Sequence, residues 1–473
     1  MDTNDFRKHA HKLVDWIADY YENIEKYPVK SQVMPGDILA QLPDSIPVEG
    51  ETMEDIFSDF EKILLPGITH WQHPKFFAYF PSNSSFPSLL GEMLISALGV
   101  QTMKWETSPA AAELEEQVMI WLREILGLPE DWDGVIQDTA STSTLSALIM
   151  AREKKSNFSI NENGFDSENS FKVYCSEETH SSTEKGVKIM GLGKNNLRKI
   201  AVDENFNMDL TVLKSTLEED IANGHTPICV VATIGTTGST AIDPLEGIAQ
   251  LCKKHDVWLH VDAAYAGSAL ILPECRWMSR GIELADSFVF NPHKWFFTNF
   301  DCSAFFVKDK ETLLRTFEIL PEYLKTKTDG LVNNYCDWGV TLGRRFRALK
   351  LWFVMRHFGL NTLQEKIRGH LKMAQDFAKK LDSNQSYKVL APVPLNLVCF
   401  QFIPNGTTDQ NEVNKLNEEL MHNINNTGKM YLTHTKLKGD FVLRLVAGQT
   451  NLEEKHMHEA WEIIDQNSKE LEN

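Results

Sequence analysis

One lysine of this chain lies in a strongly aromatic stretch. Residues 288–297 read FVFNPHKWFF, with Lys294 near the centre. An ammonium group surrounded by such residues loses hydration, so its pKa falls and more of it is the neutral amine. The neutral amine is the form that attacks a carbonyl carbon to make a Schiff base. The ordinary alternative is a lysine whose stem packs on apolar surface while its ammonium reaches water.

A candidate partner for this lysine lies 32 residues upstream (294 − 262 = 32). Residues 257–267 read VWLHVDAAYAG, which predicts a buried strand that ends in Asp262. A buried carboxylate needs a cationic partner, and a protonated pyridine ring is a planar cation that one carboxylate can hold. Alternatively, Asp262 only caps the turn that follows the strand.

A third stretch indicates an anion site. Residues 134–138 read GVIQD and lead into TASTST at 139–144, after which apolar residues follow at helical spacing. Small hydroxylated residues at the start of a helix offer backbone N–H groups and hydroxyls to an anion. Taken alone, such a run is commonly just a helix cap. Together, the three stretches favour one composite site.

The residues around Lys294 and Asp262 carry a family resemblance. The runs NPHKW at 291–295 and HVDAAYAG at 260–267 resemble the pyridoxal-phosphate-dependent group II amino-acid decarboxylases, and most of all the aromatic L-amino-acid decarboxylases. The similarity extends from Phe6 to about Trp461 and leaves out a polar insert at 156–170.

This resemblance implies an α/β fold, that of a fold type I pyridoxal-phosphate enzyme (aspartate-aminotransferase-like). The expected parts are an N-terminal helical segment (1–80), a large cofactor-binding domain with a mostly parallel seven-stranded sheet (81–358) and a small C-terminal α/β domain (359–473). Alternating helix and strand patterns after about Glu113 agree with such a sheet. Strands are expected at 173–175, 228–234, 257–261, 301–307, 397–403, 430–433 and 441–446.

The resemblance also implies roles for single residues. Lys294 is expected to hold the cofactor as a Schiff base, Asp262 to keep its pyridine nitrogen protonated, and His180 to stack on its ring. Tyr323 is expected to return a proton to the substrate's α-carbon, whereas close relatives with phenylalanine there form aldehydes. Without the resemblance, His180 is an ordinary loop histidine and Tyr323 a ring that pins a loop. Further expected cofactor contacts are Thr139, Ala140, Ser141, Thr237, Ala264, Asn291 and His293.

An aromatic stretch broken by prolines, THWQHPKFFAYFPS at 69–82, matches the family's substrate pocket. A pocket of rings suits an aromatic side chain, whereas glutamate would need a cationic partner. Gln101 and Met103 stand where animal members tend to have more apolar or aromatic residues, so the preferred ring is open. Gly343 matches the glycine of aromatic-selective members. The expected substrate contacts are Trp71, Tyr79, Phe80, Pro81, Ser82, Gln101, Met103, Phe300 and Gly343.

Composition narrows the protein class. A chain of 473 residues with 42% hydrophobic and 24% charged residues is typical of a soluble globular protein. Its net charge of −19 disfavours nucleic acid or an anionic membrane as partner. No apolar run is long enough to span a membrane and no signal region is visible, which favours the cytoplasm. Seven scattered cysteines predict reduced thiols, and no metal site is expected.

Apolar residues at helical spacing predict two N-terminal helices, from Phe6 to Tyr21 and from Met53 to Leu64. Two helices joined by a long connection do not make a compact domain, so they should pack on another surface. In the resembled family that surface belongs partly to the second subunit of a homodimer with active sites at the interface. Docking on the same chain is equally compatible with the sequence.

The predicted activity is decarboxylation of an aromatic L-amino acid (tryptophan, phenylalanine, tyrosine or dihydroxyphenylalanine) to the arylalkylamine and CO2. Two enzymatic alternatives are an aromatic aldehyde synthase of the same fold, which Tyr323 and His180 disfavour, and a decarboxylase of another L-amino acid. A non-catalytic cofactor-binding regulator would need a DNA- or partner-binding appendage, and no basic segment flanks this acidic chain.

Overall fold

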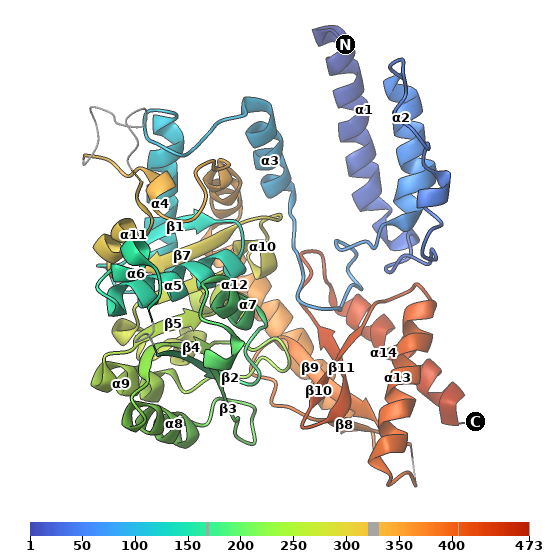
Figure 1. Cartoon of the computed structure of the whole chain (residues 1–473). Helices are drawn as coiled ribbons and strands as arrows, with labels where there is room; N and C mark the ends of the chain where they lie inside the picture. The colour runs from blue at the N-terminus through green and yellow to red at the C-terminus, as the bar shows by residue number, and fades with distance from the viewer. Residues whose placement is uncertain (167–169, 320–330, 405, 473) are drawn as a thin grey trace. The chain divides into compact units, whose positions relative to one another are not determined.

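The structure is a computed structural model that describes residues 1–166, 170–319, 331–404 and 406–472 (Figure 1). The chain forms two compact units. The first unit consists of Met1–Pro81, Asp376–Leu390 and Val398–Asn473, and the second of Ser82–Gln375 and Ala391–Leu397. The three domains predicted from the sequence stay a prediction that this division does not decide. None of the described helices combines the length and the apolar character needed to cross a bilayer.

The second unit is built on a seven-stranded sheet (Figure 1). Antiparallel pairing joins β7 to both β1 and β6, and the pairs β6–β5, β5–β4, β4–β2 and β2–β3 are parallel, which confirms the predicted mostly parallel sheet. Nearly every residue of the five inner strands is buried, as expected where both faces of a sheet are covered. In spatial order the strands are β1 (Asp133–Gln137), β7 (Ser303–Val307), β6 (Ser287–Phe290), β5 (Trp258–Asp262), β4 (Thr226–Thr233), β2 (Phe171–Ser176) and β3 (Leu197–Ile200).

Helices follow the strands along the chain and pack on this sheet (Figure 1). The helix after β1, α5 (Ala140–Lys155), contributes small side chains such as Ala147 and Ala151 to the core, which lets it approach the strands closely. The other helices of this unit are α3 (Phe86–Leu98), which lies apart from the sheet, α4 (Pro109–Leu126), α6 (Ser159–Asn163), α7 (Ser182–Ile189), α8 (Leu210–Ala222), α9 (Leu245–His255), α10 (Pro292–Trp295) and α11 (Lys310–Phe317). A long helix, α12 (Arg347–Asp382), is broken at Gly359, whose φ of 66° is non-helical.

The first unit contains the N-terminal helices and a four-stranded sheet. The first helix, α1 (Thr3–Glu22), begins with a capping box formed by Asp2 and Asp5. The second predicted helix is α2 (Met53–Asp59), which continues into a π-helical turn at Phe60–Leu64. The strands of this sheet lie in the order β10 (Thr433–Leu437), β11 (Asp440–Val446), β9 (Leu397–Phe402) and β8 (Tyr387–Val389). Along the chain, α13 (Gln410–Asn426) lies between β9 and β10, and α14 (Glu454–Glu472) follows β11.

One predicted strand of this unit is wrong. The apolar residues 430–433 were expected to form it, but β10 begins only at Thr433. Tyr431 forms an isolated bridge with Phe76 instead, so the apolar run pairs with a distant segment and does not continue the hairpin. The short strand β8 was not predicted.

Candidate active site

Lys294 lies in the single helical turn α10, between the strands β6 and β7. The three residues that follow it, Trp295, Phe296 and Phe297, are fully buried, and Lys294 itself is half-buried. This burial lowers the pKa of the Lys294 ammonium, while the charge of Asp262 acts in the opposite direction. The site therefore favours the neutral amine more than water does, as the sequence predicted.

Asp262 is the last residue of β5 and is 4% exposed. Its Oδ1 accepts a hydrogen bond of 2.9 Å from the N–H of Ala264, and no described residue donates to its Oδ2. Because β5 pairs with β6 in parallel, with Asp262 beside Val289, the carboxyl ends of the two strands lie at the same edge of the sheet. A buried carboxylate oxygen is thus open to a cationic N–H donor near Lys294.

The turn from β1 into α5 is a site for an anion. The N–H groups of Thr142 and Ser143 bond to the carbonyl of Thr139, at 3.1 and 3.2 Å. Among the described backbone hydrogen bonds, the N–H groups of Ala140 and Ser141 have no acceptor. Two free donors at the positive end of a 16-residue helix suit a phosphate group.

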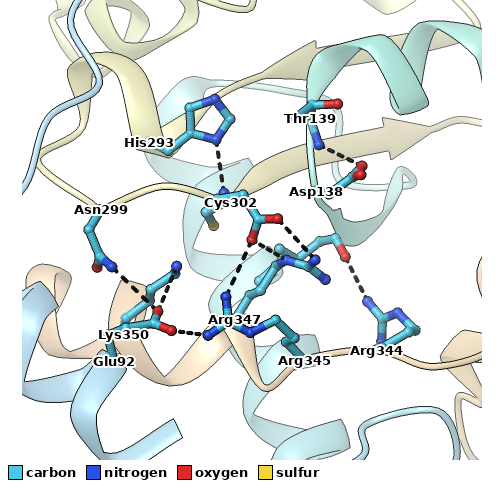
Figure 2. A network of polar contacts seen from close by, with 12 residues as sticks. Glu92, Asp138, Thr139, His293, Asn299, Cys302, Arg344, Arg345, Arg347 and Lys350 are labelled. Carbon is cyan, nitrogen blue, oxygen red and sulfur yellow. Dashed lines mark hydrogen bonds and ion pairs between the residues drawn. The ribbon is translucent and has the colours of Figure 1, made fainter. Parts of the chain in front are cut away.

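Thr139 differs from its two neighbours. Its N–H donates a hydrogen bond of 2.7 Å to Oδ1 of Asp138 (Figure 2), so only its hydroxyl remains for an anion. Thr237, another expected cofactor contact, is exposed in the segment that follows β4.

His293 presents a defined tautomer. The backbone N–H of Cys302 donates a hydrogen bond of 2.8 Å to its Nδ1 (Figure 2), and burial lowers the pKa of the imidazole to about 3. His293 is therefore neutral, with its one proton on Nε2. The ring of Phe300 lies 4.8 Å from the His293 ring, so an expected substrate contact adjoins an expected cofactor contact. Asn291 is buried, and its Oδ1 has no hydrogen-bond partner among the described residues.

His180 precedes α7 and is fixed by Ser182. The N–H of Ser182 donates to Nδ1 of His180 at 3.2 Å, and the Ser182 hydroxyl lies 2.8 Å from the same atom. Loss of hydration and the charge of Lys294 lower the pKa of His180, while Asp262 acts in the opposite direction. The imidazole is thus favoured in its neutral form with the proton on Nε2, and the three predicted residues influence one another electrostatically.

Three of the expected substrate contacts of the second unit lie together. A Cβ on Gly343 would lie 3.5 Å from Oε1 of Gln101. A backbone hydrogen bond of 3.0 Å from Thr102 to Arg344 joins the two segments, which places Met103 beside them. A pocket of about 70 Å³ connects this region to the first turn of α5, and its lining includes Asp138, Thr142, Gly343, Arg344 and Arg347. Ser82 is half-buried.

The other expected substrate contacts belong to the first unit. Trp71 and Tyr79 stack with their ring centroids 5.8 Å apart, and the Tyr79 hydroxyl lies 3.2 Å from that of Tyr431. The guanidinium of Arg444 lies 5.5 Å from the centroid of the Phe80 ring, and Pro81 is buried. Tyr323 lies outside the described residues.

A network of charged side chains that the sequence did not indicate lies next to this site (Figure 2). Glu92 of α3 pairs with Lys350 at 2.9 Å and with Arg345, and Asp301 pairs with Arg347 at 2.8 Å. A cluster of basic residues at 344–350 was visible in the sequence, but nothing in it identified the acidic partners.

These features fit pyridoxal phosphate. A half-buried lysine, a carboxylate oxygen open to a pyridine N–H, and two free backbone donors for a phosphate are the groups that this cofactor needs. The fold and the site together define a pyridoxal-phosphate-dependent enzyme of fold type I.

Comparison with known proteins gives the family. Residues 35–403 match the pyridoxal-dependent decarboxylase conserved domain, and the chain belongs to this family. It is 43% identical to "Tryptophan decarboxylase 2" of Oryza sativa subsp. japonica, over 98% of this chain and 94% of that protein. It is also 43% identical to "Phenylacetaldehyde synthase" of Arabidopsis thaliana, over 100% of this chain and 97% of that protein. A crystal structure of Oryza sativa TDC with PLP and tryptamine superposes with a TM-score of 0.97 at 36% identity, covering 100% of this chain and 99% of that one.

The predicted family, fold class, cofactor and carboxy-lyase class are thereby confirmed. The roles of individual residues stay predictions.

Proposed function

We propose that this protein removes the α-carboxyl group of aromatic L-amino acids and releases the arylalkylamine and CO2. The observation that carries the proposal is the half-buried Lys294 beside Asp262, a carboxylate with one oxygen open to a pyridine N–H. The aromatic substrate class is supported by the relatives, which include "Tryptophan decarboxylase 2" and "Tyrosine decarboxylase 3". It is also supported by the aromatic composition of residues 69–82, in which the rings of Trp71 and Tyr79 stack.

The proposed function assigns a role in cofactor binding to each of four residues. Bound pyridoxal phosphate supplies an electron sink for the pair of electrons that CO2 leaves behind. Asp262 would accept the pyridine N–H through Oδ2, and Ala140 and Ser141 would hold the phosphate through their backbone N–H groups. Lys294 would provide the neutral amine for the cofactor's aldehyde group.

The remaining roles concern protons. His180 keeps its proton on Nε2 and presents a flat neutral ring, because Ser182 occupies Nδ1. Tyr323 delivers a proton to the substrate's α-carbon, which completes the amine product.

An aldehyde synthase is the second candidate. It is favoured by the 43% identity to "Phenylacetaldehyde synthase" of Arabidopsis thaliana. The tyrosine at position 323 favours simple decarboxylation, because phenylalanine stands there in aldehyde-forming members of the family.

We also propose that the protein is a cytoplasmic homodimer that binds neither nucleic acid nor membrane. One face of α3 carries apolar side chains that are 42–60% exposed: Phe86, Leu90, Met93, Leu94 and Leu98. Its opposite face, with Ser88 and Gly91, is buried. A helix with its apolar stripe outward needs a covering surface, and a second copy of this chain provides one. Analytical ultracentrifugation should give a dimer, and Leu90→Glu should shift it toward monomer.

The activity is tested with purified protein loaded with pyridoxal phosphate and incubated with all proteinogenic amino acids plus dihydroxyphenylalanine. Mass spectrometry measures consumed amino acids, amines and aldehydes, and a peroxide assay runs in parallel. Aromatic amines without peroxide are expected, and Lys294→Ala should abolish them. Aldehyde with equimolar peroxide would replace the proposal with the synthase, and turnover of only non-aromatic amino acids would refute the substrate class.

A further inference from the structure

The segment that follows Lys294 is held by residues at and before the start of α3. The side-chain amide of Asn83 donates a hydrogen bond of 2.7 Å to the carbonyl of Lys294. The hydroxyl of Ser85 donates one of 2.7 Å to the carbonyl of Phe297. Phe297 has a φ of 54°, a backbone conformation that residues with side chains keep only where the surroundings impose it. Asn83 and Ser85 therefore help to fix the conformation of the backbone that follows Lys294.

Further hydrogen bonds join α3 to Asn299, two residues after Phe297. The N–H of Asn299 donates to the hydroxyl of Ser88 at 2.9 Å, and that hydroxyl donates back to the Asn299 side chain. The Asn299 amide also donates to Glu92 at 3.4 Å (Figure 2). Ser88 and Glu92 are four residues apart on α3, so they lie on the same face of the helix.

Glu92 is the charged centre of this arrangement. Its carboxylate pairs with Lys350, whose side chain is fully buried, at 2.9 Å, and also with Arg345. Burial alone would raise the pKa of Glu92, but the charges of Lys350 and Arg345 beside it hold the pKa below its ordinary value. Glu92 is therefore a fixed carboxylate that joins α12 to Asn299 in the segment after Lys294.

We propose that Glu92 is a positioning residue for Lys294. Acting through Asn299, and together with Ser88, it fixes the segment 294–299 so that the Lys294 amine meets the cofactor's aldehyde carbon while Asp262 meets the pyridine nitrogen. The inference rests on the proposed function of Lys294 and adds a residue that contacts neither cofactor nor substrate. It also makes α3 serve two purposes, because the apolar stripe lies on the opposite face of the same helix.

The test uses Glu92→Gln, which keeps the shape of the side chain and removes its charge. The full-length protein is freed of cofactor, and the growth of visible absorption after addition of pyridoxal phosphate gives the rate of covalent binding. Borohydride reduction followed by mass spectrometry of the Lys294 peptide gives the fraction linked at each time. We expect the rate to fall about three- to tenfold, the range of one ordinary hydrogen bond, because the contact from Asn299 to Glu92 is long at 3.4 Å. The KM for the amino acid should not change.

A matched control is Glu274→Gln. Glu274 pairs with Arg368 at 2.6 Å in the same unit, but both side chains are about half exposed, and none of the described hydrogen bonds or ion pairs joins either one to the segment 294–299. This variant should bind the cofactor at the wild-type rate. Thermal midpoints of the cofactor-free proteins, measured alongside, show whether slower binding merely follows lower stability.

Asn299→Ala is the second variant, and it tests the positioning role even if Glu92→Gln does not fold. It leaves the ion pairs of Glu92 intact and removes the link to the segment, so the same slower binding is expected. Wild-type binding rates in either folded variant, or equal slowing in Glu274→Gln, would overturn the positioning role. If the wild-type protein did not become linked at Lys294 at all, the proposed function would fail first, and the positioning role with it.

Discussion

Gly91 lies one residue before Glu92 on α3, at a position where this helix lies close to the backbone of α12. A Cβ at this position would lie 2.7 Å from Cα and 3.3 Å from the backbone nitrogen of Lys350. Carbon atoms in ordinary contact are about 3.5–4.0 Å apart. In Gly91→Ala the two helix backbones must therefore separate by about 1 Å, because no flexible side chain can yield in their place.

The energetic consequence follows from two opposing terms. Forcing an extra methyl group into a packed contact costs about 1–3 kcal/mol. Replacing glycine by alanine inside a helix returns up to about 1 kcal/mol. We expect Gly91→Ala to lower the free energy of unfolding by about 1–2 kcal/mol. The shift of α3 also moves Glu92 away from Asn299, so covalent binding of pyridoxal phosphate should slow as well.

Gly369, in α12, is the control because an added Cβ would meet no other atom within 4 Å. Gly369→Ala should raise the free energy of unfolding by up to about 1 kcal/mol through helix propensity alone. Urea unfolding of the cofactor-free proteins at one protein concentration measures both changes, since bound cofactor or a partner subunit would shift the transition. A Gly91→Ala protein as stable as the wild type, with normal cofactor binding, would refute this account of the α3–α12 contact.

Three further predictions concern the site and the core. Tyr323→Phe should divert product from amine to aldehyde with hydrogen peroxide, measured by mass spectrometry and a peroxide assay; normal amine at the normal rate would contradict the role of this tyrosine. Ser182→Ala removes one neutral hydrogen bond to His180, so kcat should fall about threefold with little change in thermal midpoint; an unchanged kcat would show that the hydroxyl does not orient the ring. Hydrogen bonds from Arg198 hold the pKa of Asp220 below its ordinary 3.8, so the stabilisation exists above that pH and is lost as the pH falls further. The difference in unfolding free energy between wild type and Asp220→Asn should therefore shrink below pH 3.8, and a constant difference would contradict the shift.

Local sequence signals were enough to single out the main candidate site residues. Asp262 ends an apolar strand, and Lys294 stands in a run of rings, so each carries its chemistry within a few neighbouring residues. The small hydroxylated residues at 139–144 likewise indicated the start of a helix, and α5 begins at Ala140. Signals of this kind depend on short-range periodicity and composition, which a single sequence contains.

The supporting residues could not be found in this way. Glu92 reads as an ordinary helix glutamate, and its partners Asn299 and Arg345 lie 207 and 253 positions away. Serine, glycine and glutamate on the buried face of α3, with leucines on the exposed face, reverse the usual amphipathic rule. The strand expected at 430–433 failed for a related reason, because Tyr431 pairs with the distant Phe76.

The strand order of the seven-stranded sheet also determines when β1 can pair with its neighbour during synthesis of the chain. The edge strand β1, which leads directly into the phosphate turn, has β7 as its neighbour in the sheet, with Asp133 opposite Val307. After Asp133 the ribosome must add 174 residues to reach Val307 (307 − 133 = 174), which takes roughly 9–35 s at about 5–20 residues per second. During that interval β1 has no strand to pair with, and α5 has no completed sheet beneath it. The nascent chain therefore carries β1 without its neighbour in the sheet until β7 has been made.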